Sequence, residues 1–594
     1  MKKRIFQYGT AGSRMMRGGW RGWIVVVVAA LMTAMGAGSC SKNFLNYTPN
    51  GTVTASDLTS PAAADALVIA AYAALGNDNW ENAISSMWVW GSIRSDEAFK
   101  GGGAITDNGQ FNQYEQYNLI TTDMGANDLE WATIFAGVSR ANKALRAIDA
   151  QTVAAYPNKV ERTAECRFLR GHFYFLLKEM FKGIPYATEA VSDDSLPLVS
   201  NVMNNDSSWE NIAQDFLFAA QNLPATQSQI GRANKYAAFA YLAKVRLYQA
   251  YEQDANNQVT SINTQHMQDV VSYTDSVINS GMYQLSADYA DNFTYSGENG
   301  VESIFAIQFS INDGTQIGRV DMADAVSYSI ASQYGCCSFH LPSQNMVNAF
   351  KTDGNGLPEF GYFNDTSLLV QQDFLTNGID PRLDHTCAIV GHPFKYQPTI
   401  IFDSNWVRVP QIYGYHDNMK EIQPATCSCL EKVGPFFGSS KNIDILRYDD
   451  VLLWQAEAYI QLGQENSALP LINMLRTRAA NSTTQTRFSD GTAPSNYRIS
   501  TYQPGVNCTW TQAYALQALQ FERRMEFGME GTRFFDLVRW GIAASTLNNF
   551  ISVEKTRFDF LANAQFTQGR DEYLPIPQTE INLTHGLYQQ NSGW

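Results

Sequence analysis

The segment FERRMEFGMEGTRFFDLVRWG, residues 521–541, carries enough charged side chains to suggest chemistry. Glu522, Glu526 and Glu530 recur every four residues, so on one helix their carboxylates would form a single stripe. Paired carboxylates act as general acid and base in hydrolases, or bind a hard metal ion. A metal or hydrolase site of this kind would want histidines nearby, and the segment contains none. The stripe alone therefore predicts no catalytic group.

The second half of the segment predicts a structural role instead. Phe534 and Leu537 would form a buried helix face, and Asp536 can pair with Arg539 three residues later. Gly531 is expected to bend or end the preceding helix. Charges buried without partners are costly, so charges that lie among large aromatic residues should be paired. We expect this segment to lock helices together.

Other patterns that could hold a metal ion or a cofactor are incomplete. The sequence has no His-Glu-x-x-His, and Asp353-Gly-Asn355-Gly lacks the remaining ligands of a calcium loop. GGGAITDNG, residues 101–109, lacks the strand–turn–helix context of a phosphate loop. Cysteines 336–337 and 427–429 do not have zinc-site spacing, and we expect buried thiols with at most one disulfide. No cofactor and no metal site is predicted.

Residues 1–39 have the order of a secretory signal. Six Lys and Arg residues and no acid precede the apolar run WIVVVVAALMTAM, which is too short to span a membrane. Small residues 36–39 then lead to Cys40, an arrangement that resembles a bacterial lipobox. The resemblance implies cleavage before Cys40 and lipidation of its sulfur. An ordinary secretory signal with an incidental cysteine is the alternative.

Cleavage there would change the net charge from −15 to −21, because residues 1–39 hold six cations. Nucleic acids and anionic membranes attract basic surfaces, so this balance argues against binding to nucleic acid. Acyl chains, rather than protein charge, would hold the chain to a membrane. A composition of 45% hydrophobic and 17% charged residues is typical of a globular protein.

Hydrophobic periodicity predicts a mainly helical chain. Helices are expected over residues 57–75, 129–149, 159–182, 208–222, 235–254, 267–279, 448–462 and 467–480. Large residues alternate with small ones such as Ala456 and Ala468, as in tetratricopeptide helix pairs, but without a strict 34-residue period. VESIFAIQFS, residues 301–310, alternates and predicts a strand. From there to about residue 440 the chain reads as a loop-rich insertion.

Residues 522–541 also match a pattern of the form E-R-x-x-E-x-x-x-E-G-x-R-x-x-D-L-x-R-W-G. In this the segment resembles the C-terminal signature of the SusD/RagB family of outer-membrane lipoproteins from Bacteroidetes. Other segments resemble the family in the same order: CSKNFL from Cys40, and residues 164–186, 231–248, 445–463 and 573–594. The resemblance covers essentially the whole mature chain.

The resemblance implies a mainly α fold, with four tetratricopeptide-like helix pairs and an irregular domain that carries short strands. The expected organisation is a signal peptide (1–39), a lipidated tether (40–60), an N-terminal helical region (61–300), a loop-rich ligand-binding insertion (301–440) and a C-terminal helical region (441–594). Such proteins sit on the extracellular face of the outer membrane. They bind a nutrient, usually an oligosaccharide, without cleaving it, and deliver it to a SusC-type TonB-dependent transporter.

The family's ligand site lies in loops that correspond to residues 92–117 and 327–340. Sugar rings stack on aromatic side chains, and their hydroxyl groups need polar partners. The candidate ligand-binding residues are Trp80, Asp96, Phe99, Asn108, Phe111, Tyr114, Tyr328, Tyr334 and Phe339. Trp88, Trp90, Trp131 and Trp454 are assigned to the core instead.

Three alternatives remain open at the level of sequence. The same scaffold could bind peptides or another nutrient. A divergent secreted glycoside hydrolase would instead place two carboxyl groups about 5 Å or 6.5–9.5 Å apart around a substrate. A purely structural surface protein would show no exposed aromatic platform in the two loops.

Overall fold

The computed structural model describes residues 60–316 and 318–594. The expected signal peptide, Cys40 and the tether up to residue 59 lie outside these residues. Helices dominate the described chain and the strands are short, so the prediction of a mainly α fold is confirmed. Within the described residues, no helix combines the length and the apolar character that crossing a membrane requires.

The α-helices are α3 (Pro61–Ala73), α4 (Gly109–Gln116), α5 (Gly125–Asp149), α6 (Lys159–Phe181), α7 (Asn205–Asn222), α8 (Lys235–Ala250), α9 (Thr264–Ile278), α10 (Gln344–Ala349), α11 (Gln371–Thr376), α12 (Leu383–Thr386), α13 (Pro410–Tyr413), α14 (Tyr448–Gln461), α15 (Glu465–Asn481), α16 (Gln512–Phe527), α17 (Arg533–Arg539), α18 (Ala543–Glu554) and α19 (Gln578–Leu583). The strands are β1 (Ala98–Gly101), β2 (Tyr251–Gln253), β3 (Val259–Ile262), β4 (Ser303–Ile307), β5 (Phe339–Pro342), β6 (Lys351–Thr352), β7 (Gly378–Ile379), β8 (Cys387–Ala388), β9 (Pro393–Phe394), β10 (Gln397–Ile401), β11 (Asp417–Asn418), β12 (Leu430–Val433), β13 (Phe436–Ser439) and β14 (Ile443–Arg447).

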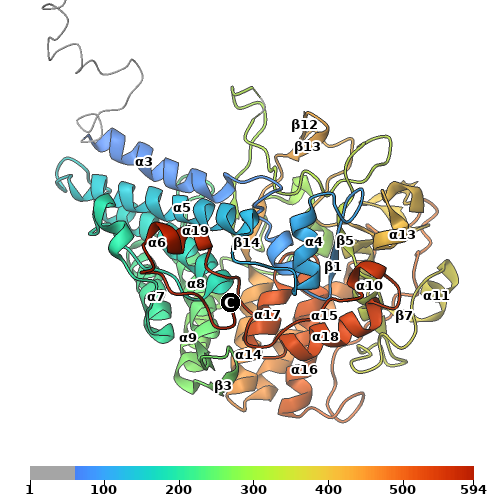
Figure 1. Ribbon diagram of the computed structural model, residues 1–594. Helices are drawn as coiled ribbons and strands as arrows, with labels where there is room; N and C mark the ends of the chain where they lie inside the picture. The colour runs from blue at the N-terminus through green and yellow to red at the C-terminus, as the bar shows by residue number, and fades with distance from the viewer. Residues whose placement is uncertain (1–59, 317) are drawn as a thin grey trace, which may run out of the picture. The chain divides into compact units, whose positions relative to one another are not determined.

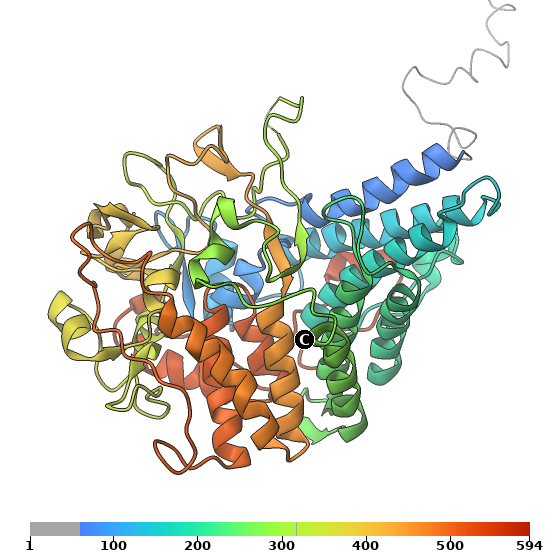
Figure 2. The same ribbon diagram turned by 180° about the vertical axis from the view of Figure 1, so that it is seen from behind.

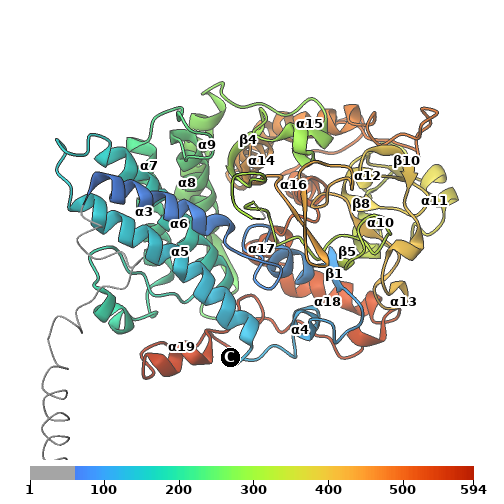
Figure 3. The same cartoon turned by 90° about the horizontal axis from the view of Figure 1, so that it is seen from above.

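Successive long helices pack side by side, as in tetratricopeptide-like proteins. Helix α3 lies on α5, and the contacts continue in order through α6, α7, α8 and α9 (Figures 1 and 3). Helix α9 then packs against α14, and α14 against α15 and α16, so the stack resumes after a long excursion of the chain (Figure 2). Asparagine caps begin several of these helices; for example, the Asn204 side chain accepts hydrogen bonds from the first turn of α7.

Strands β4 and β14 bound the loop-rich insertion. They pair antiparallel, with Ile307 opposite Ile443 and Ser303 opposite Arg447. The predicted strand at residues 301–310 is confirmed by β4. Because the two strands are neighbours, the chain leaves the helix stack and returns to it at adjacent points. Between β4 and β14, the loops contain the short strand pairs β6–β7, β9–β10, β8–β11 and β12–β13.

The main apolar core extends through both groups of helices. It contains Trp88, Trp90, Trp131 and Trp454, each at most 3% exposed, so their assignment to the core is confirmed. Trp88 donates from its indole nitrogen to the carbonyl oxygen of Ala323 at 3.0 Å, which satisfies its polar group inside the core.

Three local expectations are wrong. Helix α8 ends at Ala250 rather than at residue 254, because Tyr251 begins β2 and its hydroxyl donates to a carboxylate oxygen of Glu457 in α14. Helix α16 ends at Phe527, so Glu530 lies in the following turn and not on the stripe of Glu522 and Glu526. The third concerns cysteine: the described chain holds two disulfides, Cys336–Cys337 and Cys427–Cys429, where at most one was expected.

The turn after α16 approaches another part of the backbone very closely. Gly531 has φ +72°, which favours glycine, and the Gly531 carbonyl oxygen would lie 1.6 Å from a Cβ placed on Gly91. Two glycines are therefore needed where this turn meets the π-helix Trp88–Ile93. The contact brings residues 521–541 against the N-terminal region.

Buried ion pairs join residues 521–541 to the insertion. Glu522 and Glu526 of α16 both contact the Arg382 guanidinium, with N–O distances of 2.7 and 2.9 Å. Arg476 and Arg478 of α15 contact the same glutamates, Arg476 pairing with Glu522 and Arg478 with Glu526. The side chains of Glu522, Glu526 and Arg382 are fully buried.

Further pairs reach other elements. Glu530 contacts Lys420 of the insertion at 2.6 Å. Arg524 and Arg533 both contact Asp96, which precedes β1, at 3.2 and 2.9 Å.

The predicted Asp536–Arg539 pair is present at 2.8 Å, and Arg539 also contacts Glu457 of α14. The expectation that the charges of this segment are paired is thus confirmed.

The arginines keep the central glutamate ionised. Burial alone would raise the pKa of Glu526, but Arg478 and Arg382 outweigh burial and lower that pKa to about 2. The carboxylate therefore carries its charge at neutral pH. Its stability depends on the guanidinium groups that surround it.

We predict that Arg382→Met leaves Glu522 and Glu526 short of a partner in the core and lowers the free energy of unfolding by about 3–5 kcal/mol. Arg408→Met is the control, because Arg408 pairs with Asp107 at 3.0 Å where both side chains are well exposed; we expect it to cost less than about 1 kcal/mol. Urea unfolding followed by circular dichroism measures both. Equal stability of the two variants would contradict the structural role of the network.

Candidate functional site

The two predicted ligand loops lie side by side. Strand β1 of the first loop pairs antiparallel with β5 of the second, with Phe99 opposite Leu341 and Gly101 opposite Phe339. Trp88 contacts both loops, since its ring lies 5.6 Å from that of Phe111 and 6.4 Å from that of Phe339. The structure therefore brings together segments that are more than 200 residues apart in the sequence.

Most of the predicted ligand-binding residues are buried. Those that are at most 4% exposed are Asp96, Phe99, Phe111, Tyr114, Tyr328, Tyr334 and Phe339. Their polar groups are also largely occupied: the Tyr114 hydroxyl donates to Asn127 at 2.6 Å, and the Tyr334 hydroxyl donates to the carbonyl oxygen of Gln423 at 2.9 Å. In this conformation these seven side chains offer no open face to a ligand.

Asp96 shows why a predicted ligand residue is not available to a ligand. Burial would raise its pKa, but Arg524 and Arg533 outweigh burial and lower that pKa to about 2. Its carboxylate oxygens contact both guanidinium groups. The charge of Asp96 therefore serves the ion-pair network described above.

Trp80 and Asn108 are the two predicted residues that keep partial exposure. Asn108 immediately precedes α4 with φ +49°, and its side chain makes no capping hydrogen bond. Trp80 lies in the loop between α3 and the π-helix, where its ring is 6.3 Å from the ring of Phe436. No contact between Trp80 and Asn108 is present in the described chain.

Sequence reasoning missed Phe436 and its neighbour Phe437. Both begin β13 after the turn Gly434-Pro435, and both are partly exposed. The Phe437 ring lies 6.0 Å from Tyr328 and 6.3 Å from Tyr334. The available signal was the pair of adjacent phenylalanines after a Gly-Pro turn. Adjacent strand residues point to opposite faces, so a single hairpin cannot bury both rings equally.

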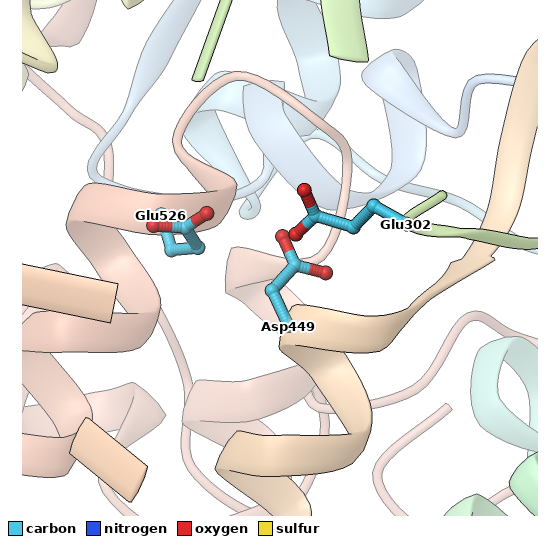
Figure 4. A group of neighbouring side chains, drawn as sticks. All are labelled: Glu302, Asp449 and Glu526. Atoms are coloured by element: carbon cyan, nitrogen blue, oxygen red, sulfur yellow. The ribbon is translucent and has the colours of Figure 1, made fainter. Parts of the chain in front are cut away.

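Three buried carboxylates meet behind this region. Glu302, Asp449 and Glu526 each offer an oxygen atom within 4.8 Å of the others (Figure 4). Arg478 contacts Glu302 at 3.1 Å and also contacts Glu526, and Arg447 contacts Asp449 at 3.0 Å. Guanidinium groups thus balance the carboxylates, and the group belongs to the ion-pair network rather than to an open cleft.

The interior also holds polar cavities that are small for a sugar chain. One of about 100 Å³ is lined by residues that include Asp321, Glu421 and Lys420. A second of about 100 Å³ lies nearer the helices, and both are bordered by Arg447 and Glu530. Sites that enclose drug-sized ligands usually measure about 300–1,000 Å³, so these cavities suit water molecules.

A wider depression of about 490 Å³ lies near the C-terminus. Its lining is polar and includes Gln258, Thr567 and Arg570, without an aromatic ring. Trp80 and Phe436, by contrast, are partly exposed aromatic residues whose rings lie 6.3 Å apart.

Two family models match the chain. Residues 44–247 match the model described as "Starch-binding associating with outer membrane", and residues 301–594 match the model described as "SusD family". Among curated relatives, a SusD-like protein of Bacteroides ovatus is 23% identical over 87% of this chain and 82% of its own length. SusD-like protein P2 of Formosa agariphila is 25% identical over 82% of this chain and 85% of its own length.

Solved structures share the fold. A SusD homolog from Bacteroides thetaiotaomicron superposes with a TM-score of 0.67 at 20% identity, covering 91% of this chain and 99% of that one. Surface glycan-binding protein A from the same organism, in complex with laminarihexaose, gives a TM-score of 0.62 at 20% identity, covering 90% of this chain and all of that one. With family models matched on both sides of residue 300 and the fold shared over nine-tenths of its length, the chain belongs to the SusD/RagB family.

Proposed function

We propose that the protein binds an oligosaccharide on the extracellular face of the outer membrane, without cleaving it, and delivers it to a SusC-type TonB-dependent transporter. The observation that carries the proposal is the match of residues 44–247 to a family described by starch binding and association with the outer membrane. Membership of the SusD/RagB family over the rest of the chain supports it.

Structural neighbours support a glycan as the ligand. One is described as a laminarin-binding SusD-like protein, with a TM-score of 0.60 over 90% of this chain. Another holds laminarihexaose on the same fold. Because the same fold holds a glucan in one neighbour, an oligosaccharide is the ligand that we propose here. The identity of the sugar depends on loops that differ between relatives.

The geometry of the carboxylates supports binding without cleavage. A glycoside hydrolase needs two carboxyl groups that flank a bound sugar. Glu522 and Glu526, the residues that first suggest such a pair, are fully buried and contact arginines. They hold the fold together and have no access to a substrate.

The surface aromatic residues support a site of the stacking type. Trp80 is the predicted ligand residue whose ring remains partly exposed, and it contacts a second partly exposed ring, Phe436. Asn108, directly before α4, is the other predicted ligand residue that keeps partial exposure. We propose these groups as contacts for the ring face and the hydroxyl groups of the ligand.

Membrane attachment would come from acyl chains on Cys40. Each buried methylene group contributes about 0.8 kcal/mol, and two or more chains suffice for stable anchoring. The acidic mature chain offers no net positive charge for anionic lipids. The lipid therefore carries the whole attachment in this proposal.

We predict saturable binding of at least one oligosaccharide by the lipoprotein purified in detergent. Isothermal titration calorimetry against plant, host and microbial oligosaccharides, with several peptides included, measures it. Chromatography of the same samples checks for cleavage products, and none are expected because Glu522 and Glu526 are buried against arginines.

Binding of peptides alone would contradict a glycan ligand and would indicate that the same scaffold binds another nutrient. Release of shorter sugars would contradict the non-catalytic proposal. Failure of the whole panel to bind would contradict glycan capture by the isolated protein.

We predict that Cys40→Ser moves the protein from the membrane pellet to the soluble fraction, because it removes the sulfur that carries the lipid. Cell fractionation and the mass of the N-terminal peptide measure this. Cys508→Ser is the matched control, since Cys508 is a free cysteine of the described chain and should leave fractionation unchanged. Retention of the Cys40→Ser variant in the membrane would contradict lipid anchoring at this position.

A further inference from the structure

Three buried acidic residues of the insertion lack the basic partners that Glu526 has. Asp321 and Asp324 are each 4% exposed, and the Glu421 side chain is 7% exposed. Among the described residues, no lysine or arginine forms an ion pair with any of the three. The Nδ1 atom of His340 lies 2.8 Å from a Glu421 oxygen but makes no hydrogen bond to it. Burial lowers the pKa of His340 to about 3, so this imidazole is neutral and does not balance the charge.

The same three side chains line the polar cavity of about 100 Å³ described above. One carboxyl oxygen of Asp324 and both of Glu421 have no hydrogen-bond partner, and the hydroxyl groups of Ser85 and Ser86 on the cavity wall have none either. Buried polar atoms are normally hydrogen-bonded, so these groups depend on what enters the cavity. A space of this size holds a few water molecules.

The charges around the cavity do not balance if all of its acidic residues are ionised. Its lining has five acidic and three basic residues, an excess of two negative charges: Asp321, Asp324, Glu421, Asp444 and Glu530 against Lys420, Lys441 and Arg447. Lys420 and Arg447 both contact Glu530, and the Lys441 ammonium donates to the carbonyl oxygen of Asn442 at 2.7 Å. The basic residues of the lining are therefore engaged elsewhere.

Neighbouring elements do not supply the missing positive charge. Asp78 and Asp417 add further acids beside the cluster. Lys395 faces Glu421, but its ammonium donates to the carbonyl oxygens of Met419 and Lys420, and burial lowers the pKa of Lys395 well below its usual range.

Either a cation or protons must neutralise such a cluster. A calcium ion takes several oxygen ligands at about 2.3–2.6 Å, so those oxygens lie close to one another. In the part of the chain that the structure describes, the carboxylates gathered within 4.8 Å of one another are Glu302, Asp449 and Glu526, which arginines already balance. The geometry at the cavity therefore favours protons.

The electrostatics agree with this geometry. Burial raises the pKa of Asp321 well above its usual range, and repulsion by Asp324 raises it further. Burial likewise raises the pKa of Asp324, and repulsion by Glu421 adds to the effect. Burial also raises the pKa of Glu421.

The cluster lies where separate segments of the chain meet. The Asp321 N–H donates to the Ser439 carbonyl oxygen at 2.7 Å, and the Ser439 N–H donates to Asp321 at 3.2 Å, which joins the β12–β13 hairpin to the segment that carries the acids. Ser85 and Ser86 come from residues 77–86, between α3 and the π-helix, and form another wall of the cavity. Charges that appear in the cavity would act on both contacts.

We propose that Asp321, Asp324 and Glu421 hold protons at neutral pH and form a pH-sensitive junction between residues 77–86 and the insertion. As the pH rises, each carboxyl group gives its proton to a base in the solvent and keeps the negative charge. Like charges then face one another across a cavity without a cation, and the junction opens. The inference goes beyond the proposed binding function and does not depend on the identity of a ligand.

The sign of the pH dependence follows from proton binding. An acidic residue in the unfolded chain ionises at about pH 4, so above that pH the folded protein binds more protons at this cluster than the unfolded protein does. Unfolding releases these protons, and the free energy of unfolding falls as the pH rises. An exposed acid such as Asp490 acts in the opposite sense, because hydrogen bonds from Thr492 lower its pKa.

Hydrogen exchange measured by mass spectrometry on the lipoprotein in detergent tests the junction. Peptides that cover residues 320–327 and 436–444 report on the hydrogen bonds between Asp321 and Ser439. After correction for the intrinsic effect of pH on exchange, we expect their protection to fall at least about tenfold between about pH 6 and about pH 9, as loss of one or more protons requires. Protection in α14 should stay constant.

Asp321→Asn, Asp324→Asn and Glu421→Gln, combined in one variant, replace each protonated carboxyl group by a neutral amide of similar shape. Protection of the two peptides should then change less than about twofold over the same range, because no proton remains to be lost. Asp324→Asn alone should show a smaller fall than the wild type. Asp490→Asn is the matched control, since Asp490 is exposed and away from the cavity, and it should keep the full fall.

Constant protection in the wild-type protein would overturn the inference, and that measurement needs no variant to fold. A full fall that persists in Asp324→Asn or in the combined variant would overturn it as well, because other groups would then be responsible. Elemental analysis supplies a further check. One divalent cation per wild-type chain, absent from the combined variant, would show that a metal ion rather than protons neutralises the cluster.

Discussion

Two glutamates one turn apart in α16 depend on arginines from two other parts of the chain. Arg382 comes from the insertion, and Arg476 and Arg478 come from α15. A buried carboxylate without such partners would be very costly, so the helix can occupy its place only when the insertion and α15 occupy theirs. The same segment reaches the N-terminal region through Asp96 and the helix stack through Glu457. Charge pairing, added to apolar packing, thereby couples regions that lie hundreds of residues apart.

This coupling explains why a segment so rich in acids and bases performs no chemistry in the proposed function. Carboxylates that act on a substrate need solvent access and a tuned pKa. Here the pKa of Glu526 is held near 2 by neighbouring guanidinium groups, and its side chain is sealed from water. The β12–β13 hairpin and the loop of Trp80 present partly exposed aromatic rings beside exposed charged residues such as Glu81 and Lys432. In the proposed function, binding and architecture therefore use different residues.

Much of the fold follows from local sequence. The periodicity of apolar residues located helices α3, α5 to α9, α14 and α15, and the alternation in VESIFAIQFS located β4. Boundaries were harder, because the end of α8 depends on a contact between Tyr251 and Glu457 that no local pattern reveals. Glu530 shows the same limit: its four-residue spacing suits a helix, but α16 ends at Phe527, before Gly528, and does not reach it.

The candidate site could be located only approximately from sequence. The two predicted loops do lie together, but Phe99, Phe111 and Phe339 turn inward around Trp88 and the β1–β5 pair. A glycine-rich loop suggests exposure of its neighbours, whereas their burial depends on strands more than 200 residues away. Phe436 was missed because its contact with Trp80 joins residues that are distant in the sequence, and no local pattern reveals that contact.

The pairing of β4 with β14 has a consequence for how such proteins diversify. Because residues 308–442 begin and end on neighbouring strands, that segment can change in length without moving the strands at its two ends apart. A segment of another length would leave and rejoin the helix stack at the same two adjacent points, with α9 still packed against α14. Such a segment would need basic residues at the positions of Arg382 and Lys420, because these two residues pair with Glu522 and Glu530 outside the segment. Exchange of the whole segment would also remove β5, the strand that pairs with β1, so a replacement must supply that strand as well as the two basic residues.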